Sequence, residues 1–393
     1  MIARERYELL CSDGFRRSVE ECICRDPLDI ALDKRLPCAA EVASQVKYLQ
    51  RAQHKLPSYF AARCIIPSLA FEQSSSELCA LHKPLAGNSV LDLTCGLGVD
   101  AFALSKRFRR VVTVERDEVL ADVARENFRR LGATNIEVVR DTAEHVAATV
   151  GTRFDWCYAD PDRRGPHGEK LVRLQDCSPD IISLMPRLLA IADNVCVKAS
   201  PMFDIDEAFR LFGRCRVEVV SLDDECKEVL ITVGRSDSAV ASADSSAVVA
   251  TALSAGSFSV TAEELAAFVP TAPASFRGGE YRWLVRPDVA LQKARLVRRH
   301  LAGKADVWSE NGYGFAVERP DGILGRVFEI ESVERFDPKR LRRELKGVGV
   351  EIMRRDFPLT TQRLKQMTGI REGGDIRLAF TSVGGEVLVI RLK

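Results

Sequence analysis

The length, composition and charge of the chain exclude several classes of protein. With 393 residues, it is too long for one ordinary hydrophobic core, so we expect two to four domains. Hydrophobic residues make up 46% of the chain and charged residues 29%, which is typical of soluble globular proteins, and a net charge of +1 favours no class of partner. The sequence has neither an apolar run long enough to span a membrane nor an apolar signal core at its N-terminus, which predicts a cytoplasmic protein without a membrane partner.

The twelve cysteines do not follow the spacing of a disulfide framework or a metal site. No CxxC pair occurs, and the nearest approach to one is Cys22-Ile-Cys24. Several others, such as Cys157 and Cys196, lie inside apolar runs. This pattern predicts reduced, buried thiols and no metal.

The first part of the chain, residues 1–82, has the apolar spacing of amphipathic helices. Ser75 or Ser76 could cap a helix over residues 77–82. The polar cluster that contains these serines directly precedes the first predicted strand. It could be no more than a helix start, or Gln73 and the serines, Ser75 among them, could fold back over the glycine turn that follows the first strand.

Residues 83–235 alternate between strand and helix patterns. The predicted strands cover residues 89–93, 111–114, 135–139, 154–159, 194–199, 217–221 and 229–233. The predicted helices cover residues 101–107, 120–131 and 181–190. This alternation indicates an α/β fold with a Rossmann-like, doubly wound parallel sheet, which binds ligands outside the carboxyl ends of its strands.

The stretch VLDLTCGLGVD, residues 90–100, places Gly96 and Gly98 between the first strand and the first helix of this sheet. Glycines at such a turn let the backbone approach a ligand closely. Glu115 ends the second strand, 17 residues after Gly98, where a carboxylate can bind a ribose diol. The spacing of GLGVDA also allows a dinucleotide. Asp92, however, would repel a pyrophosphate and attract an ammonium group.

A ligand with an amino-acid end, a ribose and an adenine fits all the acids at these strand ends. Asp92 would lie near the ammonium group, Glu115 at the ribose and Asp141 near the adenine amine. We therefore expect S-adenosylmethionine as the cofactor. The predicted cofactor-binding residues are Gln73, Ser75, Asp92, Thr94, Cys95, Gly96, Gly98, Asp100, Glu115, Arg116, Asp141 and Asp160.

The loop DPDRRG, residues 160–165, follows the fourth strand and is the candidate for the reacting end. The predicted catalytic residues are Asp160, Pro161, Arg163 and Arg164. Asp160 could orient an amine or a ring nitrogen of the acceptor, and the arginines could hold a phosphate or stack on a base. The alternative is a proline-anchored turn with solvated arginines. Lys198 and Ser200 could line the acceptor pocket or only begin the loop that follows their strand.

These motifs carry a family resemblance. VLDLTCGLGVD, VTVE, Asp141 and YADPDRRG resemble the successive motifs of class I S-adenosylmethionine-dependent methyltransferases. From about Pro27 to Lys393 the chain resembles more closely a bacterial family of methyltransferases that have a THUMP-like C-terminal domain. This closer resemblance rests on KLPSYF, IIPSLAFEQSSSE, DLTCGLGVDAFAL, VERDE, DPDRRG, VKASPMFDID and DDECKEVL.

The resemblance has limits. GLGVDAFAL with VER also resembles a family of ribosomal RNA guanine methyltransferases, but only over that short block. Cys95 stands where a second glycine is commoner, and Asp162 where related motifs carry alanine or proline. In 5-methyluridine enzymes a DPPR loop works with a nucleophilic cysteine. Here Cys196 lies inside an apolar strand, which favours a structural thiol.

The C-terminal part predicts smaller α+β units. Residues 236–256 are rich in serine and alanine, a composition that predicts a linker. Residues 257–322 form a small α+β domain, with a helix predicted over residues 287–301. Residues 323–393 follow the order strand, helix, strand, helix and hairpin, which resembles a THUMP-like, ferredoxin-like domain.

The segment from residue 323 carries a net charge of about +5. Its predicted RNA-binding residues are Lys339, Arg342, Arg343, Lys346, Arg354 and Arg355. The first four share one face of a helix, and such a patch favours phosphate backbones, although a solvated helix face is the alternative. The sequence therefore predicts an S-adenosylmethionine-dependent methyltransferase that acts on a base in a structured RNA, either rRNA or tRNA. The alternatives are an RNA-binding protein that only retains the cofactor fold and a small-molecule methyltransferase. No oligomeric state is predicted.

Overall fold

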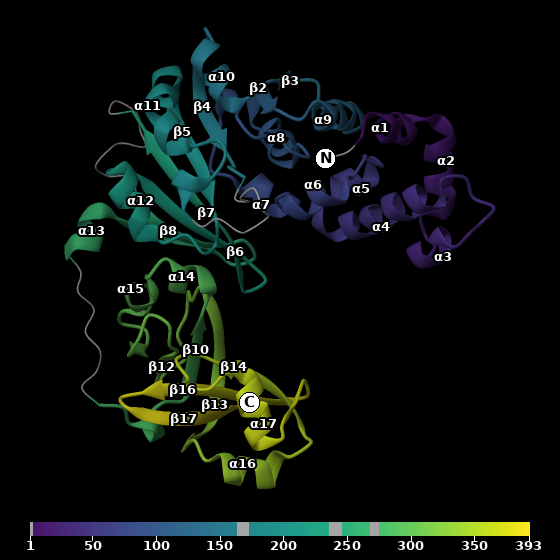
Figure 1. The fold of residues 1–393 in the computed structure, drawn as a ribbon. Helices are drawn as coiled ribbons and strands as arrows, with labels where there is room; N and C mark the ends of the chain where they lie inside the picture. Colours follow the sequence, from purple (N-terminus) through teal and green to yellow (C-terminus); the bar gives the residue numbers. More distant parts are fainter. Residues whose placement is uncertain (1–2, 163–172, 236–245, 268–274) are drawn as a thin grey trace. The chain divides into compact units, whose positions relative to one another are not determined.

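The computed structural model describes residues 3–162, 173–235, 246–267 and 275–393 (Figure 1). The chain forms two compact units. The first comprises residues 1–216 and 229–242, and the second comprises residues 217–228 and 243–393. Within the described ranges, no helix is both long and apolar enough to cross a lipid bilayer.

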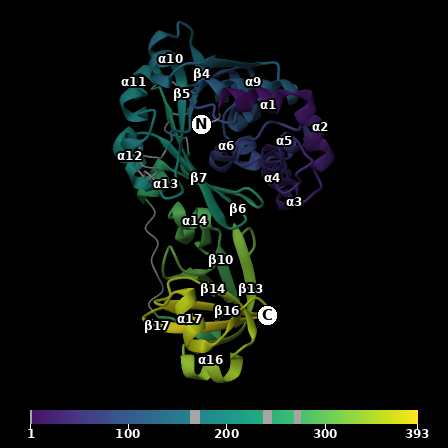
Figure 2. The ribbon, with the colours of Figure 1, turned by 45° about the vertical axis from the view of Figure 1, so that its right-hand side comes forward.

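Helices make up the N-terminal part of the first unit, as predicted. They are α1 (Arg4–Cys11), α2 (Asp13–Cys22), α3 (Pro27–Ala31), α4 (Ala39–Lys55), α5 (Pro57–Ala61), α6 (Ser68–Gln73) and α7 (Glu77–His82). Local caps set several starts: the Ser76 side chain accepts a hydrogen bond from the Cys79 amide at the start of α7. Ser76 is thus the cap, and Ser75 is free for another role. In both views α1 to α6 gather on one side of the sheet of this unit (Figure 1 and Figure 2).

The sheet of the first unit confirms the predicted α/β architecture. Its strands are β1 (Gly87–Asp92), β2 (Phe108–Glu115), β3 (Ile136–Arg140), β4 (Phe154–Ala159), β5 (Ala192–Ala199) and β7 (Glu225–Gly234). They lie in the order β3-β2-β1-β4-β5-β7, with parallel neighbours except that β7 runs antiparallel to β5. The accompanying helices are α8 (Val99–Leu104), α9 (Glu118–Arg130), α10 (Ala143–Thr149), η1 (Leu174–Asp176), α11 (Ile181–Ile191) and α12 (Ile205–Phe212).

The register brings the carboxyl ends of the central strands to one edge. Asp92 of β1 pairs with Thr113 of β2 on one side and with Tyr158 of β4 on the other. The residues that follow β1, β2 and β4 therefore emerge together. This is the edge at which an open α/β sheet binds its ligand.

The second unit begins with β6 (Arg216–Leu222), β8 (Ser246–Ala252), β9 (Gly256–Thr261) and α13 (Ala262–Ala267). β8 pairs in parallel with β6 and antiparallel with β9. The prediction of a linker is therefore wrong for residues 246–252, which form β8, with residues 247–252 buried. Residues 236–245 of that prediction lie outside the described residues.

The remaining strands of the second unit form one sheet in the order β11-β12-β10-β13-β17-β16-β14-β15. The strands are β10 (Trp283–Pro287), β11 (Asp306–Val307), β12 (Gly314–Ala316), β13 (Gly325–Arg335), β14 (Gly349–Arg354), β15 (Arg371–Glu372), β16 (Ile376–Val383) and β17 (Glu386–Leu392). The helices are η3 (Gly278–Glu280), α14 (Val289–Lys293), α15 (Val297–Leu301), α16 (Pro338–Leu345) and α17 (Thr361–Thr368). Because β10 pairs with β13, the predicted boundary at residues 322/323 does not separate two sheets.

Two predictions in this unit had different outcomes. The single helix predicted over residues 287–301 is wrong, because Arg295 adopts a left-handed conformation with φ of 56° between α14 and α15. The order predicted after residue 323 is confirmed: Asp337 caps α16, Thr360 caps α17, and β16 pairs with β17 as a hairpin. α16 and α17 lie side by side, and their leucines pack on the sheet in one apolar cluster (Figure 1).

Candidate functional site

A cleft of about 1370 Å³ opens in the first unit at the carboxyl ends of the sheet strands. Residues after β1, β2, β3, β4 and β5 line it, together with residues of the N-terminal helices. The predicted site residues that line it are Gln73, Ser75, Thr94, Cys95, Gly96, Asp100, Glu115, Arg116, Asp141, Asp160 and Pro161. Tertiary structure thus brings most of the predicted site into one cavity.

Gly96 and Glu115 form one wall of this cleft. Gly96 has a φ of 53°, and a Cβ placed on it would meet no atom within 4 Å, so the glycine leaves open space beside its backbone. Its amide donates to Glu115 Oε2 at 2.9 Å, and the Asp117 amide donates to Oε1 at 2.9 Å. Burial raises the pKa of Glu115. A carboxylate offers about four acceptor positions, so two remain for ligand hydroxyls.

Asp141 and Arg116 lie on the neighbouring part of the lining. Asp141 directly follows β3; its carboxylate accepts from the Thr142 amide at 2.7 Å and lies 2.6 Å from His145 Nδ1. The hydrogen bond with His145 lowers the pKa of Asp141, which keeps it an acceptor at neutral pH. Arg116 Nη1 donates to Ser178 Oγ at 3.2 Å.

Asp92 is not among the residues that line the cleft, and its predicted contact with an ammonium group stays a prediction. Its side chain is fully buried, accepts from Thr113 Oγ1 at 2.6 Å and from the Thr94 amide at 3.0 Å, and is absent from the lining. Burial raises the pKa of Asp92 to about 7. Asp92 acts on the site indirectly: it holds Thr94, whose Oγ1 accepts from the Asp160 amide at 2.7 Å.

Gly98 is also absent from the lining, and its need for glycine has a packing cause. It has a φ of 86°, and a Cβ there would lie 2.6 Å from Cζ of Phe128. Close packing against α9 thus explains the glycine, and its predicted role in binding the cofactor stays a prediction. Cys95, at the start of the same turn, is buried. Its amide donates a hydrogen bond to the carbonyl of Val114 at 2.9 Å, which connects the glycine turn to β2.

A buried charge network underlies the reacting end of the cleft; it consists of Lys83, Asp100, Ser75, Lys198 and Asp160. Lys198 Nζ donates to Asp160 Oδ2 at 2.6 Å and to Ser75 Oγ at 2.9 Å. Ser75 Oγ in turn donates to Asp100 Oδ2 at 3.1 Å, and Lys83 Nζ lies 3.3 Å from Asp100 Oδ1. The network joins the helical region to the sheet.

The charges in this network compensate one another. Burial alone would raise the pKa of Asp100, but the cations of Lys83 and Lys198 and the hydrogen bonds from Ser75 and Tyr158 lower it. Lys83 is only 1% exposed and escaped sequence reasoning, because a single lysine before a proline carries no motif. Lys198 was predicted only as one option for the acceptor pocket; its position at the end of β5 was the available signal.

Other residues of interest lie outside this arrangement. Arg163 and Arg164, predicted to be catalytic, lie outside the described residues. Cys196 is fully buried in β5 and is absent from the cleft lining, in agreement with a structural thiol.

Leu69 and Met202 line the cleft, although 48% and 74% of their surfaces are exposed, so they offer apolar surface to an incoming acceptor.

The basic surface predicted in the second unit is present, with one correction. Leu341 and Leu345 of α16 are buried, whereas the predicted basic residues of this helix and its C-cap are exposed. They are Lys339, Arg342, Arg343 and Lys346, called the basic helix face below. Arg354 is also exposed, but Arg355 is half-buried and donates to the carbonyl of Pro287 at 2.8 Å. Arg355 therefore does not belong to the exposed surface, because its side chain turns inward after β14.

Family models match both units. A model described as a methyltransferase domain matches residues 90–161, which run from the second half of β1 to the end of β4 and include the glycine turn of the cleft. A model described as THUMP domain-like matches residues 325–392, which include β13 to β17.

Similar proteins extend these matches along the chain. An uncharacterized S-adenosylmethionine-dependent methyltransferase of Mycobacterium tuberculosis is 26% identical over 348 residues, which cover 85% of this chain and 90% of the relative. A crystal structure of a candidate methyltransferase from Porphyromonas gingivalis W83 has a TM-score of 0.82 at 25% identity and covers 100% of this chain and 99% of that one. Over 88 residues, or 22% of this chain and 20% of the relative, the chain is 40% identical to the 23S rRNA (uracil(1939)-C(5))-methyltransferase RlmD of Stenotrophomonas maltophilia.

Proposed function

We propose that this chain, an S-adenosylmethionine-dependent methyltransferase with a THUMP-like domain, methylates a base in a structured RNA, either an rRNA or a tRNA. The observation that carries the proposal is that one chain combines the cleft at the sheet edge with a THUMP-like domain bearing the basic helix face. The first supports the donor half of the reaction, and the second supports an RNA acceptor.

The cleft residues suit the groups of S-adenosylmethionine. The open space beside Gly96 admits a ligand against the backbone, and the remaining acceptor positions of Glu115 suit the two hydroxyls of a ribose. Asp141 is an acceptor for an adenine amine. When bound, the cofactor supplies a methyl group on a cationic sulfur, and placing the acceptor in line with it is the main task left to the protein.

Asp160 is the residue proposed to position the acceptor. Thr94 holds its amide and Lys198 holds Oδ2, so the carboxylate has a fixed orientation in the cleft wall. Oδ1 can then accept a hydrogen bond from an exocyclic amine or a ring N–H of a base. The apolar surfaces of Leu69 and Met202 suit the plane of such a base. A carbon acceptor that needs a cysteine nucleophile is less well served, since Cys196 is buried.

The RNA half of the proposal rests on charge and on similarity. The basic helix face presents its cations to solvent, while the leucines of the same helix anchor it to the sheet. Such a surface binds phosphates by releasing their counterions, without reading the base sequence. The partial similarity to an rRNA methyltransferase supports the same class of substrate.

The test is transfer of labelled methyl from S-adenosylmethionine to total RNA isolated from cells that lack the protein, followed by nucleoside analysis. We expect one methylated base. Reversing the charges of the basic helix face should weaken RNA binding and reduce the salt slope by about one unit per lost phosphate contact. The matched control reverses four exposed cations of the N-terminal part: Arg16, Arg17, Lys34 and Arg35. Label in protein or small molecules but not in RNA would refute the proposed substrate.

A further inference from the structure

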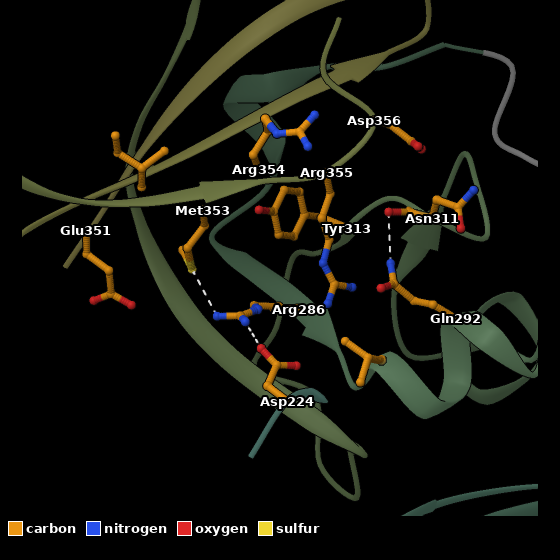
Figure 3. A pocket seen from close by; sticks show the side chains of 12 residues that line it. Asp224, Arg286, Gln292, Asn311, Tyr313, Glu351, Met353, Arg354, Arg355 and Asp356 are labelled. Atoms are coloured by element: carbon orange, nitrogen blue, oxygen red, sulfur yellow. Dashed lines mark hydrogen bonds and ion pairs between the residues drawn. The ribbon is translucent and has the colours of Figure 1, made fainter. Parts of the chain in front are cut away.

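A second cavity, of about 430 Å³, lies within the second unit and is made of residues that the cleft does not use (Figure 3). Its lining comes from β10, α14, the segment before β12, and β14 with the residues that follow it. Three arginines line it, together with the carboxylates of Asp224, Glu351 and Asp356. Arg286 is paired with Asp224, and Arg354 Nη1 donates to the carbonyl of Phe357 at 3.2 Å. The third, Arg355, is only partly satisfied.

Arg355 and Tyr313 each carry a donor that has no acceptor in the part of the chain that the structure describes. Arg355 Nη2 donates to the carbonyl of Pro287, and its guanidinium lies 5.7 Å from the centre of the Tyr313 ring. Its Nη1 is buried without a hydrogen-bond partner among the described residues, and so is the hydroxyl of Tyr313, a side chain only 2% exposed. Buried polar atoms in folded proteins nearly always have a partner. Two such atoms, on two side chains that line one cavity, therefore indicate a missing acceptor next to it.

The protonation states of these two groups are defined at neutral pH. Burial lowers the pKa of Arg355 to about 10 and raises the pKa of Tyr313 to about 12. Arg355 therefore remains a cation, and Tyr313 keeps its proton. Figure 3 shows the Arg286 side chain on the same side of the cavity as its partner Asp224, with the Gln292 amide on the other side.

We propose that this cavity binds a phosphate group, with Arg355 Nη1 and the Tyr313 hydroxyl as its donors. A phosphate has several acceptor oxygens, and guanidinium groups suit them in geometry and charge. An apolar or cationic ligand would leave both donors unpaired. The volume is in the range of pockets that hold a small molecule, so the phosphate belongs to a ligand about the size of one nucleotide. Its source is either a free nucleotide or the end of an RNA.

The test measures binding by calorimetry, using the full chain saturated with S-adenosylhomocysteine so that the cleft is blocked. The probes are inorganic phosphate, uridine 5′-monophosphate and uridine, and we expect the two phosphates to bind and uridine to fail. Tyr313→Phe should weaken phosphate binding by about tenfold. It should not lower the melting temperature, since the lost hydroxyl has no partner in the described structure. Thr381→Val is the matched control, because it removes another buried hydroxyl that has no partner among the described residues and does not line the cavity.

A 5′-phosphorylated oligoribonucleotide and its 5′-hydroxyl counterpart distinguish the two sources. Tighter binding of the phosphorylated RNA, lost in Tyr313→Phe, assigns the cavity to an RNA end. Binding of the mononucleotide with no difference between the RNAs assigns it to a free nucleotide. Binding that is absent, or unchanged in Tyr313→Phe, overturns the proposal and leaves water as the occupant. RNA methylation is a separate readout, so failure of the proposed substrate and failure of this site are distinguishable.

Discussion

Replacing Lys198 with methionine tests the buried charge network beneath the cleft. The Lys198 side chain is 8% exposed and the Asp160 side chain 22%, and they form an ion pair at 2.6 Å. The substitution removes the cation and leaves the Asp160 carboxylate unpaired in a largely buried position. Asp100 is affected less, because Lys83 still lies 3.3 Å from it.

The magnitude follows from this burial. Breaking a buried ion pair by removing one partner costs about 3–5 kcal/mol. Since solvent reaches part of Asp160, we expect the free energy of unfolding to fall by about 2–3 kcal/mol. Replacing both residues, with Asp160→Asn added, removes the unpaired charge and should recover about 1–2 kcal/mol of that loss.

Urea unfolding of the four proteins in this cycle measures the coupling between the two residues. Of the three tryptophans, Trp156 lies in β4, so a background in which Trp283 and Trp308 are phenylalanine reports on the first unit. Lys198→Met should also reduce methyl transfer more than cofactor binding, and Lys198→Arg should restore most of it. A Lys198→Met protein as stable as the parent, or a double variant whose effects simply add, would refute the reasoning.

Two further predictions concern Gly96 in the cleft and the buried Asp92. Gly96→Ala places a Cβ in the ligand space at a φ of 53°, and we expect at least about tenfold weaker S-adenosylmethionine binding in a titration. Gly132→Ala is the control, since it has a φ of 69°, open space and no place in the cleft; equal weakening in both variants would contradict the assignment. Asp92 has a pKa of about 7 when folded against 3.8 ordinarily, so its contribution to stability is complete below about pH 4 and is lost as pH rises to 7. Asp92→Asn should abolish this loss of folding stability, which is at most about 4 kcal/mol. The measurement is the melting temperature of variant and parent from pH 4 to 8. If the two melting temperatures change in parallel with pH, Asp92 is not the cause of the loss.

Sequence patterns determined the features that depend on neighbours within a few residues. The apolar residues at 89–93 and the β-branched run at 111–114 predicted β1 and β2, and the serines before residue 77 predicted the start of α7. Because the carboxyl ends of parallel strands share an edge, the sequence also predicted that Glu115, Asp141 and Asp160 line one cleft. Their spacing along the chain was enough for that inference.

Tertiary structure alone decided which side chains line the cleft and which form the buried charge network next to it. Lys198 meets Ser75 across 123 residues of sequence and Asp160 across 38, distances over which no local pattern operates. Asp92 points inward because the hydroxyl of Thr113, on the neighbouring strand, donates a hydrogen bond to its carboxylate. Arg354 and Arg355 follow each other at the end of a strand, where successive side chains point to opposite faces, so Arg354 is exposed whereas Arg355 is half-buried and donates to the carbonyl of Pro287. The pattern of charge predicted a basic surface, but the packing of each strand decided which arginines belong to it.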